Sequence, residues 1–292
     1  MTAGVATILR RRGRSGDPNR GRVFQSFWIY VVCVVLGAIT LIPLLYVVLG
    51  GFRTTGQIAA HPVAWPHPWI TSNYTSIATS GAFWRQIGNS AIIAGIATLV
   101  IVTLGSSVAY ALARYDFRGR EILYTVFTLG LLLPLTVAVL PLYIELRQFG
   151  ILDNPLGVAL PEAAFGLPVT VIILRPFMRA IPSDLEDAAA IDGCSKIGFF
   201  WRILIPLSRP ALMTVAVLAV VTSWNAFLLP LIVLNNPNDW TLPLGVAAYQ
   251  GEYAQDTAAI LAYTALSMVP ALIFFMGAER RIVRGLSGAV KG

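Results

Sequence analysis

The stretch Ile181-Pro-Ser-Asp-Leu-Glu-Asp-Ala-Ala-Ala-Ile-Asp-Gly193 is a short acidic run with consecutive alanines, and it lies between two apolar segments. Ser183 followed three residues later by Glu186 is a capping-box pattern, and Gly193 supplies a left-handed helix stop. Acidic residues at the start also suit the positive end of the helix dipole. The helix expected over 184–192 is roughly 13 Å long at about 1.5 Å per residue, far short of the roughly 30 Å hydrocarbon core. It must therefore lie outside the bilayer.

Composition places the rest of the chain in a membrane. Of the 292 residues 57% are hydrophobic and only 12% are charged, which is more apolar surface than one soluble core of this size buries. Windows long enough to span as helices, free of charge except for Glu162, are 23–52, 86–113, 122–144, 154–174, 210–238 and 257–278. The prolines expected to kink or interrupt them are Pro43, Pro134, Pro141, Pro230 and Pro270. The sequence predicts an all-α integral membrane protein with six transmembrane helices.

The basic residues predict its orientation. All but three of the 21 lysines and arginines fall on the side that also carries both termini and the 181–193 helix, the exceptions being Arg53, Arg85 and Arg147. By the positive-inside rule this side is the cytoplasm. We therefore expect a multi-pass protein of a bacterial-type (inner) cell membrane with both termini cytoplasmic. The net charge of +7 is then mostly a topological signal, and no nucleic-acid partner is expected.

The sequence offers little support for chemistry within this chain. It contains no glycine-rich phosphate loop ending in Lys-Ser or Lys-Thr, so no ATP or Mg²⁺ site is expected here. His61 and His67 share one exterior loop without acidic or cysteine companions, which argues against a metal site. Cys33 and Cys194 are expected to lie far apart, which argues against a disulfide. Without a constellation of catalytic groups, the chain is not expected to be an enzyme.

Residues 187–206 resemble the cytoplasmic signature of ABC importer permeases: Glu-Ala-Ala, three residues, Gly, nine residues, Ile, one residue and Leu-Pro. The corresponding residues here are Asp187-Ala188-Ala189, Gly193, Ile203 and Ile205-Pro206. Aspartate at 187 and isoleucine at 205 are conservative departures that leave the spacing unchanged. The resemblance implies the type I ABC importer permease (MetI-like) fold, with six transmembrane helices and a cytoplasmic coupling helix.

The resemblance covers nearly the whole chain and is closest to carbohydrate permeases of the maltose-transporter type, in particular the smaller permease partner. Similar residues occur at 89–90, 109–114, 117–119, 224–227 and 230–231, and the last nine residues resemble the tail of that partner. The Arg-rich N-terminus has no counterpart in the family. The expected organisation is a disordered basic cytoplasmic tail over 1–23, a transmembrane permease domain over 24–283 with its coupling region at 183–206, and a cytoplasmic tail over 284–292.

The resemblance also implies a set of partners. The chain is expected to pair with a second permease as a heterodimer within membrane lipid, and to pass a sugar delivered by an extracytoplasmic solute-binding protein. Two separate ATPase subunits bind ATP and Mg²⁺, and their closure rocks the permease pair through the docked coupling helix. The residues assigned to ATPase coupling are Ser183, Asp184, Glu186, Asp187, Ala188, Ala189, Asp192, Gly193, Ile203 and Pro206, and those assigned to a tail contact are Gly288, Lys291 and Gly292.

Polar groups inside the spans are the candidates for a substrate path, because they are costly in lipid. The hydroxyls of a sugar would suit Glu162, Thr222, Ser223 and Asn225, and Trp224 offers an aromatic face for a pyranose ring. Structural roles compete with these: hydrogen bonding for Glu162 and packing for Trp224.

Other functions remain as alternatives to a sugar importer. An importer for a polyol, a sugar phosphate or an amino acid shares the same signature, since that motif concerns only the ATPase face. A gradient-driven carrier or a membrane-embedded enzyme needs acid and base groups within the membrane, and Glu162 alone is too little for either.

Overall fold

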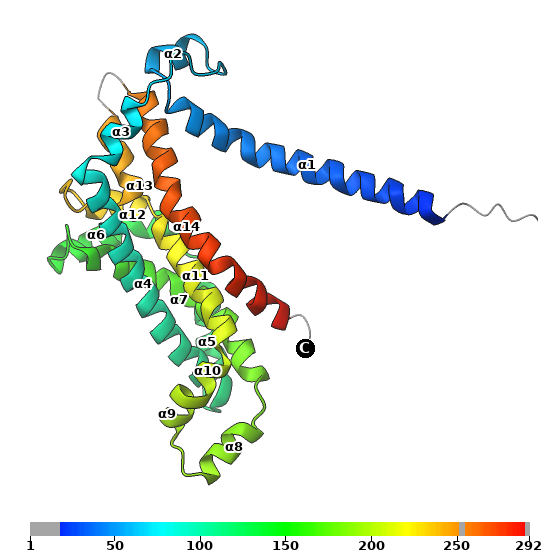
Figure 1. Cartoon of the computed structure of the whole chain (residues 1–292). Coiled ribbons are helices and arrows are strands. Elements are labelled where there is room, and N and C mark those ends of the chain that lie inside the picture. Colours follow the sequence, from blue (N-terminus) through cyan, green and yellow to red (C-terminus); the bar gives the residue numbers. More distant parts are fainter. Residues whose placement is uncertain (1–17, 251–254, 290–292) are drawn as a thin grey trace, which may run out of the picture.

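A computed structural model describes residues 18–250 and 255–289 (Figure 1). Every element named across these residues is a helix, so the expected all-helical fold is confirmed. The longest are α1 (Pro18–Gly50), α4 (Gly81–Arg114), α7 (Pro155–Ala180) and α14 (Thr257–Ala289). Residues 18–23 of the expected tail belong to α1 and 284–289 belong to α14, while 1–17 and 290–292 lie outside the described residues.

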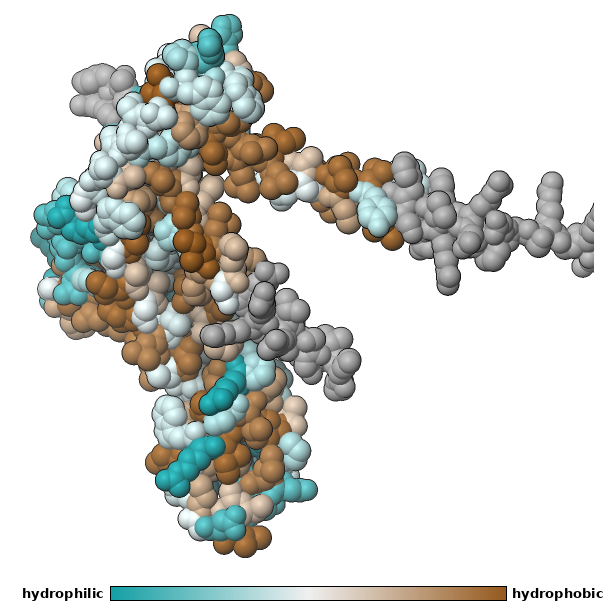
Figure 2. Space-filling view, in the orientation of Figure 1, coloured by the Kyte–Doolittle hydropathy of each residue, from teal (hydrophilic) through white to brown (hydrophobic). Residues whose placement is uncertain are grey.

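Up to six spans can be counted in the described part of the chain, if each of two bent helix pairs is taken as one span. Four are single helices: α4, α7, Trp28–Gly50 of α1 and Thr257–Gly277 of α14. The other two are bent pairs, α5 (Arg120–Gly130) with α6 (Leu135–Gln148), and Lys196–Leu207 with α11 (Arg209–Trp224). Figure 2 shows apolar residues along α1 and over much of the bundle, as expected for surfaces that face lipid.

The window 122–144 does not form one continuous helix. The chain breaks after Gly130, and α5 and α6 meet at 99°. Pro134 directly precedes α6 and has an extended backbone (φ −74°, ψ 135°). A break is expected before it, because proline has no N–H to donate and disfavours a helical conformation in the preceding residue. The interruption expected at Pro134 is confirmed, whereas helices continue through Pro43, Pro141 and Pro270.

The window 210–238 is also not one helix. α11 ends at Trp224, where the Asn225 side chain donates to the Val221 carbonyl at 2.8 Å, and α12 (Leu228–Val233) follows. Asparagine suits such an end because its short amide competes for backbone groups. At its other end α11 meets the preceding segment at 79°, next to the fully buried Ser208.

Short helices lie at the two ends of the bundle (Figure 1). One end carries α2 and α3, and the opposite end carries α8 and α9. Their bounds are Thr55–Ala60 (α2), Ser72–Ala78 (α3), Asp184–Ile191 (α8), Lys196–Phe199 (α9), a π-helical stretch Phe200–Leu204, Ile205–Leu207 (α10), Leu242–Gly245 (α13) and a 3₁₀ turn Val246–Tyr249.

The centre of the bundle is α4, which packs along α7 and α11. Close approach to α7 depends on small residues: Gly105 on α4 faces Thr170, and Gly166 on α7 faces Ile101. Without side chains at these points, two membrane helices can bring their backbones together. By contrast, α1 leaves the bundle and contacts α14 near one end (Figure 1).

Arg53 holds together the segment that follows α1. The residue is 3% exposed, and its guanidinium donates to the carbonyls of Pro62 (3.0 Å), Gln57 (2.6 Å) and His61 (2.5 Å). Asn73 in turn donates to the Arg53 carbonyl at 2.9 Å. One charged side chain therefore holds α2 and the loop that follows it in place.

Replacing Arg53 with methionine is expected to open this loop, at a cost of about 3 kcal/mol, because three charge-assisted hydrogen bonds are lost while the apolar stem is retained. Proteolysis in right-side-out and inverted vesicles measures it, and we expect much faster cleavage between residues 54 and 70. Arg85→Met is the matched control, since Arg85 is exposed. Equal cleavage rates in the two variants would contradict the prediction.

Candidate functional site

The acidic helix α8 forms the tip of the molecule opposite α2 (Figure 1). Its attachment is Ala189, which is 6% exposed and belongs to a buried cluster with Met178 of α7 and Phe199 of α9. The Ala189 carbonyl also accepts from the Cys194 N–H at 2.8 Å. Because alanine is small, this face of α8 lies directly on the end of the bundle.

The prediction of a capping box at the start of α8 is wrong, whereas the helix stop predicted at Gly193 is confirmed. Ser183 has helical dihedrals (φ −64°, ψ −30°), and its side chain forms no capping hydrogen bond. Its carbonyl accepts from the Glu186 N–H at 2.8 Å, while the Glu186 carboxylate faces Arg114 instead of completing the box. Gly193 has a φ of +75°, in the left-handed region that glycine adopts without strain.

The outer face of α8 is apolar with an acidic border. Leu185 is 42% exposed and Ile191 is 87% exposed, with the exposed Ala188 between them at a spacing of three residues. Asp184 and Asp187 are exposed beside them and take part in none of the ion pairs of the described residues. An apolar stripe next to unpaired carboxylates suits a partner groove with basic residues at its edge.

Arg114, the last residue of α4, links this helix to α8. Its side chain is 7% exposed, its guanidinium donates to the Ile181 carbonyl at 2.7 Å, and its Nε lies 3.9 Å from a carboxylate oxygen of Glu186. From the sequence, Arg114 was interpreted as a topological charge and as part of the family-like run 109–114, and no contact with the 184–192 helix was expected. Its acceptor lies 67 residues further along the chain, so no local pattern indicates the contact.

A second link joins α4 to α9. The Tyr110 hydroxyl donates to the Lys196 carbonyl at 3.1 Å and receives a hydrogen bond from Tyr115 at 2.8 Å. The Lys196 ammonium lies 4.6 Å from the Tyr115 ring centroid, and the Tyr110 and Phe200 rings are 5.1 Å apart. Both sides of the coupling segment are therefore fastened to the same end of α4.

Arg175 fastens that end of α4 to the rest of the bundle. From α7 it donates to the Leu112 carbonyl at 3.2 Å, pairs with Glu121 of α5 at 2.5 Å and lies 3.9 Å from the centroid of the Tyr124 ring. This role was also missed, although an arginine flanked by Leu174 and by apolar residues beyond Pro176 is a signal that could have suggested burial.

The remaining predicted coupling residues divide between surface and core. Asp192 is exposed and ends α8, whereas Ile203 and Pro206 are partly buried and Ile203 packs against the cluster that contains Ala189. Gly288 falls within α14, and Lys291 and Gly292 lie outside the described residues. The exposed part of the predicted set is therefore α8 and its stop.

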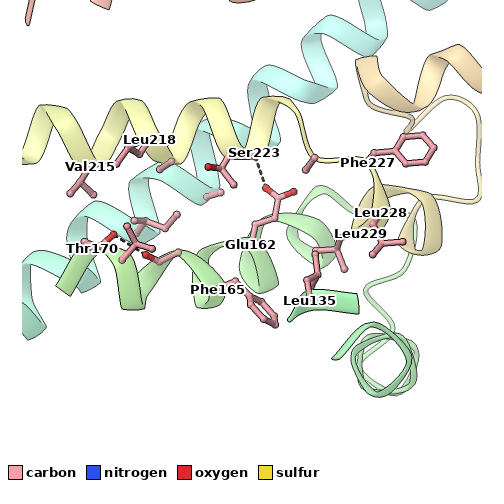
Figure 3. A pocket seen from close by; sticks show the side chains of 17 residues that line it. Leu135, Glu162, Phe165, Thr170, Val215, Leu218, Ser223, Phe227, Leu228 and Leu229 are labelled. Carbon is pink, nitrogen blue, oxygen red and sulfur yellow. Dashed lines mark hydrogen bonds between the residues drawn. The ribbon is translucent and has the colours of Figure 1, made fainter. Parts of the chain in front are cut away.

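A separate cavity of about 340 Å³ lies among α4, α7, α11 and α12 (Figure 3). Most of its lining is apolar, and Glu162 of α7 projects into it. One oxygen of this carboxylate accepts a hydrogen bond from the Ser223 hydroxyl of α11. The other oxygen, Oε1, is buried without a partner in the described residues.

The predicted path residues are only partly brought together. Thr222 and Ser223 line the cavity with Glu162. Trp224 is not part of its lining; it packs against the cluster that contains Phe83, Leu242 and Tyr263. Asn225 is exposed and ends α11. Neighbouring residues of a helix point in different directions, so Ser223 lines the cavity while Trp224 packs on another face of α11.

The chain matches the family described as binding-protein-dependent transport system inner membrane component over residues 101–287. It is 33% identical over 260 residues to the diacetylchitobiose uptake system permease protein NgcG of Streptomyces coelicolor, covering 88% of this chain and 86% of that protein. It is also 33% identical over 259 residues to the arabinooligosaccharides transport system permease protein AraQ of Halalkalibacterium halodurans, covering 87% and 92%.

The fold is similar to that of a chain in a solved bacterial ABC transporter involved in the import of the acidic polysaccharide alginate. The TM-score is 0.75 at 20% identity, covering 89% of this chain and 96% of that chain. The matched family region contains α8, its anchor Ala189 and the whole lining of the cavity from Ile101 onward. The chain therefore belongs to the binding-protein-dependent transport system inner membrane components, the permease subunits of ABC transporters.

Proposed function

We propose that this permease subunit imports a saccharide as part of an assembly with a second permease, two ATPase subunits and an extracytoplasmic binding protein. The named relatives act on diacetylchitobiose and on arabino-oligosaccharides, which supports a sugar as the solute. ATP and Mg²⁺ bind to the ATPase subunits, because the sequence of this chain has no phosphate-binding loop. Its own task is to form part of the path and to follow the ATPase cycle.

The observation that carries this proposal is the construction of α8. Its outer face exposes Leu185, Ala188 and Ile191 to a partner, while Ala189 and Arg114 fasten the opposite side to the bundle. A helix that is exposed for docking and yet held at its base transmits displacement, whereas a loosely attached loop helix absorbs it.

The positive-inside rule supports placing the α8 end in the cytoplasm. Both chain termini, with the tails over 1–23 and 284–292, are then cytoplasmic, and the α2 end faces the binding protein. Gly288, Lys291 and Gly292 belong to a tail that reaches the ATPase in this proposal. The basic composition of the tails on that side supports this orientation.

Replacing Ile191 with aspartate is expected to reduce co-purification of the ATPase at least tenfold, because it puts a charge into the apolar stripe at its most exposed residue, an effect of about 2 kcal/mol. The measurement is affinity purification of the tagged chain from native membranes, with an ATPase that carries a phosphate-binding loop identified and quantified by mass spectrometry.

The control is Val63→Asp, because Val63 is 92% exposed in the loop at the opposite end of the molecule. It makes the same chemical change and is expected to leave ATPase recovery unchanged. Recovery of the ATPase with the Ile191 variant at the level of the parent chain would refute the docking role of α8.

A further inference from the structure

We propose that the cavity among α4, α7, α11 and α12 binds one sugar ring of the transported solute directly, with Glu162 accepting hydrogen bonds from its hydroxyls. This inference rests on the proposed function and adds to it that this subunit itself contacts the solute. It also restricts the solute to neutral or cationic sugars.

The carboxyl group of Glu162 lies within a membrane span. Glu162 lies eight residues inside α7, between Pro161 and Ala163, which are both buried. An ionisable side chain within a membrane span is costly, so one that is present calls for a stabilising partner. Ser223 supplies a single hydrogen bond, to one of the two oxygens.

The second oxygen indicates the ligand. Glu162 Oε1 is buried and has no donor among the described residues, although buried acceptors are nearly always satisfied. A carboxyl oxygen accepts hydrogen bonds, and a protonated carboxyl group can also donate one, so a hydroxyl group, which both donates and accepts, is a suitable partner in either state. Figure 3 shows the Glu162 side chain extending from α7 toward α11, between Ser223 and the apolar wall that includes Leu135 and Leu229.

The rest of the cavity lining favours a sugar as the molecule that donates hydrogen bonds to Glu162. Phe165 and Phe227 contribute aromatic side chains that suit the apolar C–H face of a pyranose, and Thr222 adds a hydroxyl. A volume of about 340 Å³ is at the small end of ligand sites and fits one ring at a time. Among the described residues, no lysine, arginine or histidine lines the cavity. A uronate or a sugar phosphate would therefore place its anion in a mostly apolar cavity, beside an acidic side chain and with no basic residue of this lining to offset it.

A purely structural role makes a different prediction, and Ser223 distinguishes the two. If Glu162 only bridges α7 to α11, then Ser223→Ala breaks the same bridge and matches Glu162→Ala in effect. If Glu162 holds a sugar, Ser223→Ala leaves the acceptor in place and has the smaller effect.

The test is protection of a cysteine placed in the cavity wall. Thr222→Cys is made in a chain with Cys33→Ser and Cys194→Ser, assembled with its partner subunits in membrane vesicles, and labelled with N-ethylmaleimide. The probes are D-glucose, N-acetyl-D-glucosamine, L-arabinose, maltose and, as the anionic comparison, D-glucuronate. At least one neutral sugar is expected to slow labelling, by about tenfold when present at about ten times its Kd, and D-glucuronate is not.

Adding Glu162→Ala is expected to abolish this protection, and adding Ser223→Ala is expected to retain most of it. Absence of protection by every neutral sugar, stronger protection by D-glucuronate, or equal loss in the two alanine variants would each overturn the inference. Co-purification with the Ile191 variant tests the importer assignment separately, so a failure here and a failure of that assignment are distinguishable.

Discussion

Replacing Gly105 with leucine is expected to prevent the helix bundle from folding stably. A Cβ atom at Gly105 would overlap the methyl group of Thr170 and lie 3.0 Å from its Cβ. Thr170 cannot easily turn aside, because it is 2% exposed and its hydroxyl donates to the Gly166 carbonyl at 2.9 Å. Overpacking at this contact is expected to cost about 3 kcal/mol or more, and Gly105→Ala a smaller part of that.

The measurement is the amount of monodisperse protein recovered after solubilisation, together with its thermal unfolding temperature. Gly95→Leu is the matched control on the same helix, because Gly95 is exposed and a Cβ there meets nothing within 4 Å. Leucine also has the better helix propensity, by close to 1 kcal/mol. If the two variants are equally stable, the close packing of α4 on α7 is not what holds the bundle together.

Replacing Arg114 with alanine is expected to uncouple transport from ATP hydrolysis. The variant loses the hydrogen bond to the Ile181 carbonyl and the ion pair with Glu186, so α8 keeps its exposed docking face but loses its fastening to α4. The assembly should form and hydrolyse ATP. Solute moved per ATP is expected to fall by about tenfold, which corresponds to about 1.4 kcal/mol of coupling free energy.

Reconstituted assemblies give this ratio directly, as uptake and phosphate release measured in the same proteoliposomes. Arg118→Ala is the matched control, because it removes the same charge from the exposed turn that follows α4. Arg114→Lys retains a donor and a positive charge and should restore part of the ratio. A normal ratio with Arg114→Ala would show that Arg114 does not transmit motion, and loss of the whole assembly would contradict the expectation that the docking face of α8 survives without it.

Local patterns were enough to predict α8 and the class of the fold. The helix was expected over 184–192 and runs over Asp184–Ile191, and Gly193 is left-handed as expected. These features depend on residues close together in the chain, such as three alanines followed by a glycine. The apolar windows depend on composition alone, so the number of spans and the all-helical class could also be predicted from the sequence.

The direction of the chain inside a window could not be predicted. An apolar run has the same composition whether it crosses once or turns by 99° at Pro134. The capping box at the start of α8 was also misjudged, because Glu186 fits the capping pattern in the sequence, whereas its carboxylate faces Arg114 in the folded chain. In the case of Glu186, a local preference was overridden by a contact with a distant segment.

The sequence by itself therefore determined which segments are apolar, where the short helix outside the membrane begins and ends, and which family the chain resembles. The tertiary structure alone decided what the arginines do. Arg114 and Arg175 find their carbonyl partners 67 and 63 residues away, and Glu162 meets Ser223 across 61 residues. Such partners are chosen when helices pack and buried polar groups must be satisfied within the bundle, because lipid offers them no hydrogen bonds.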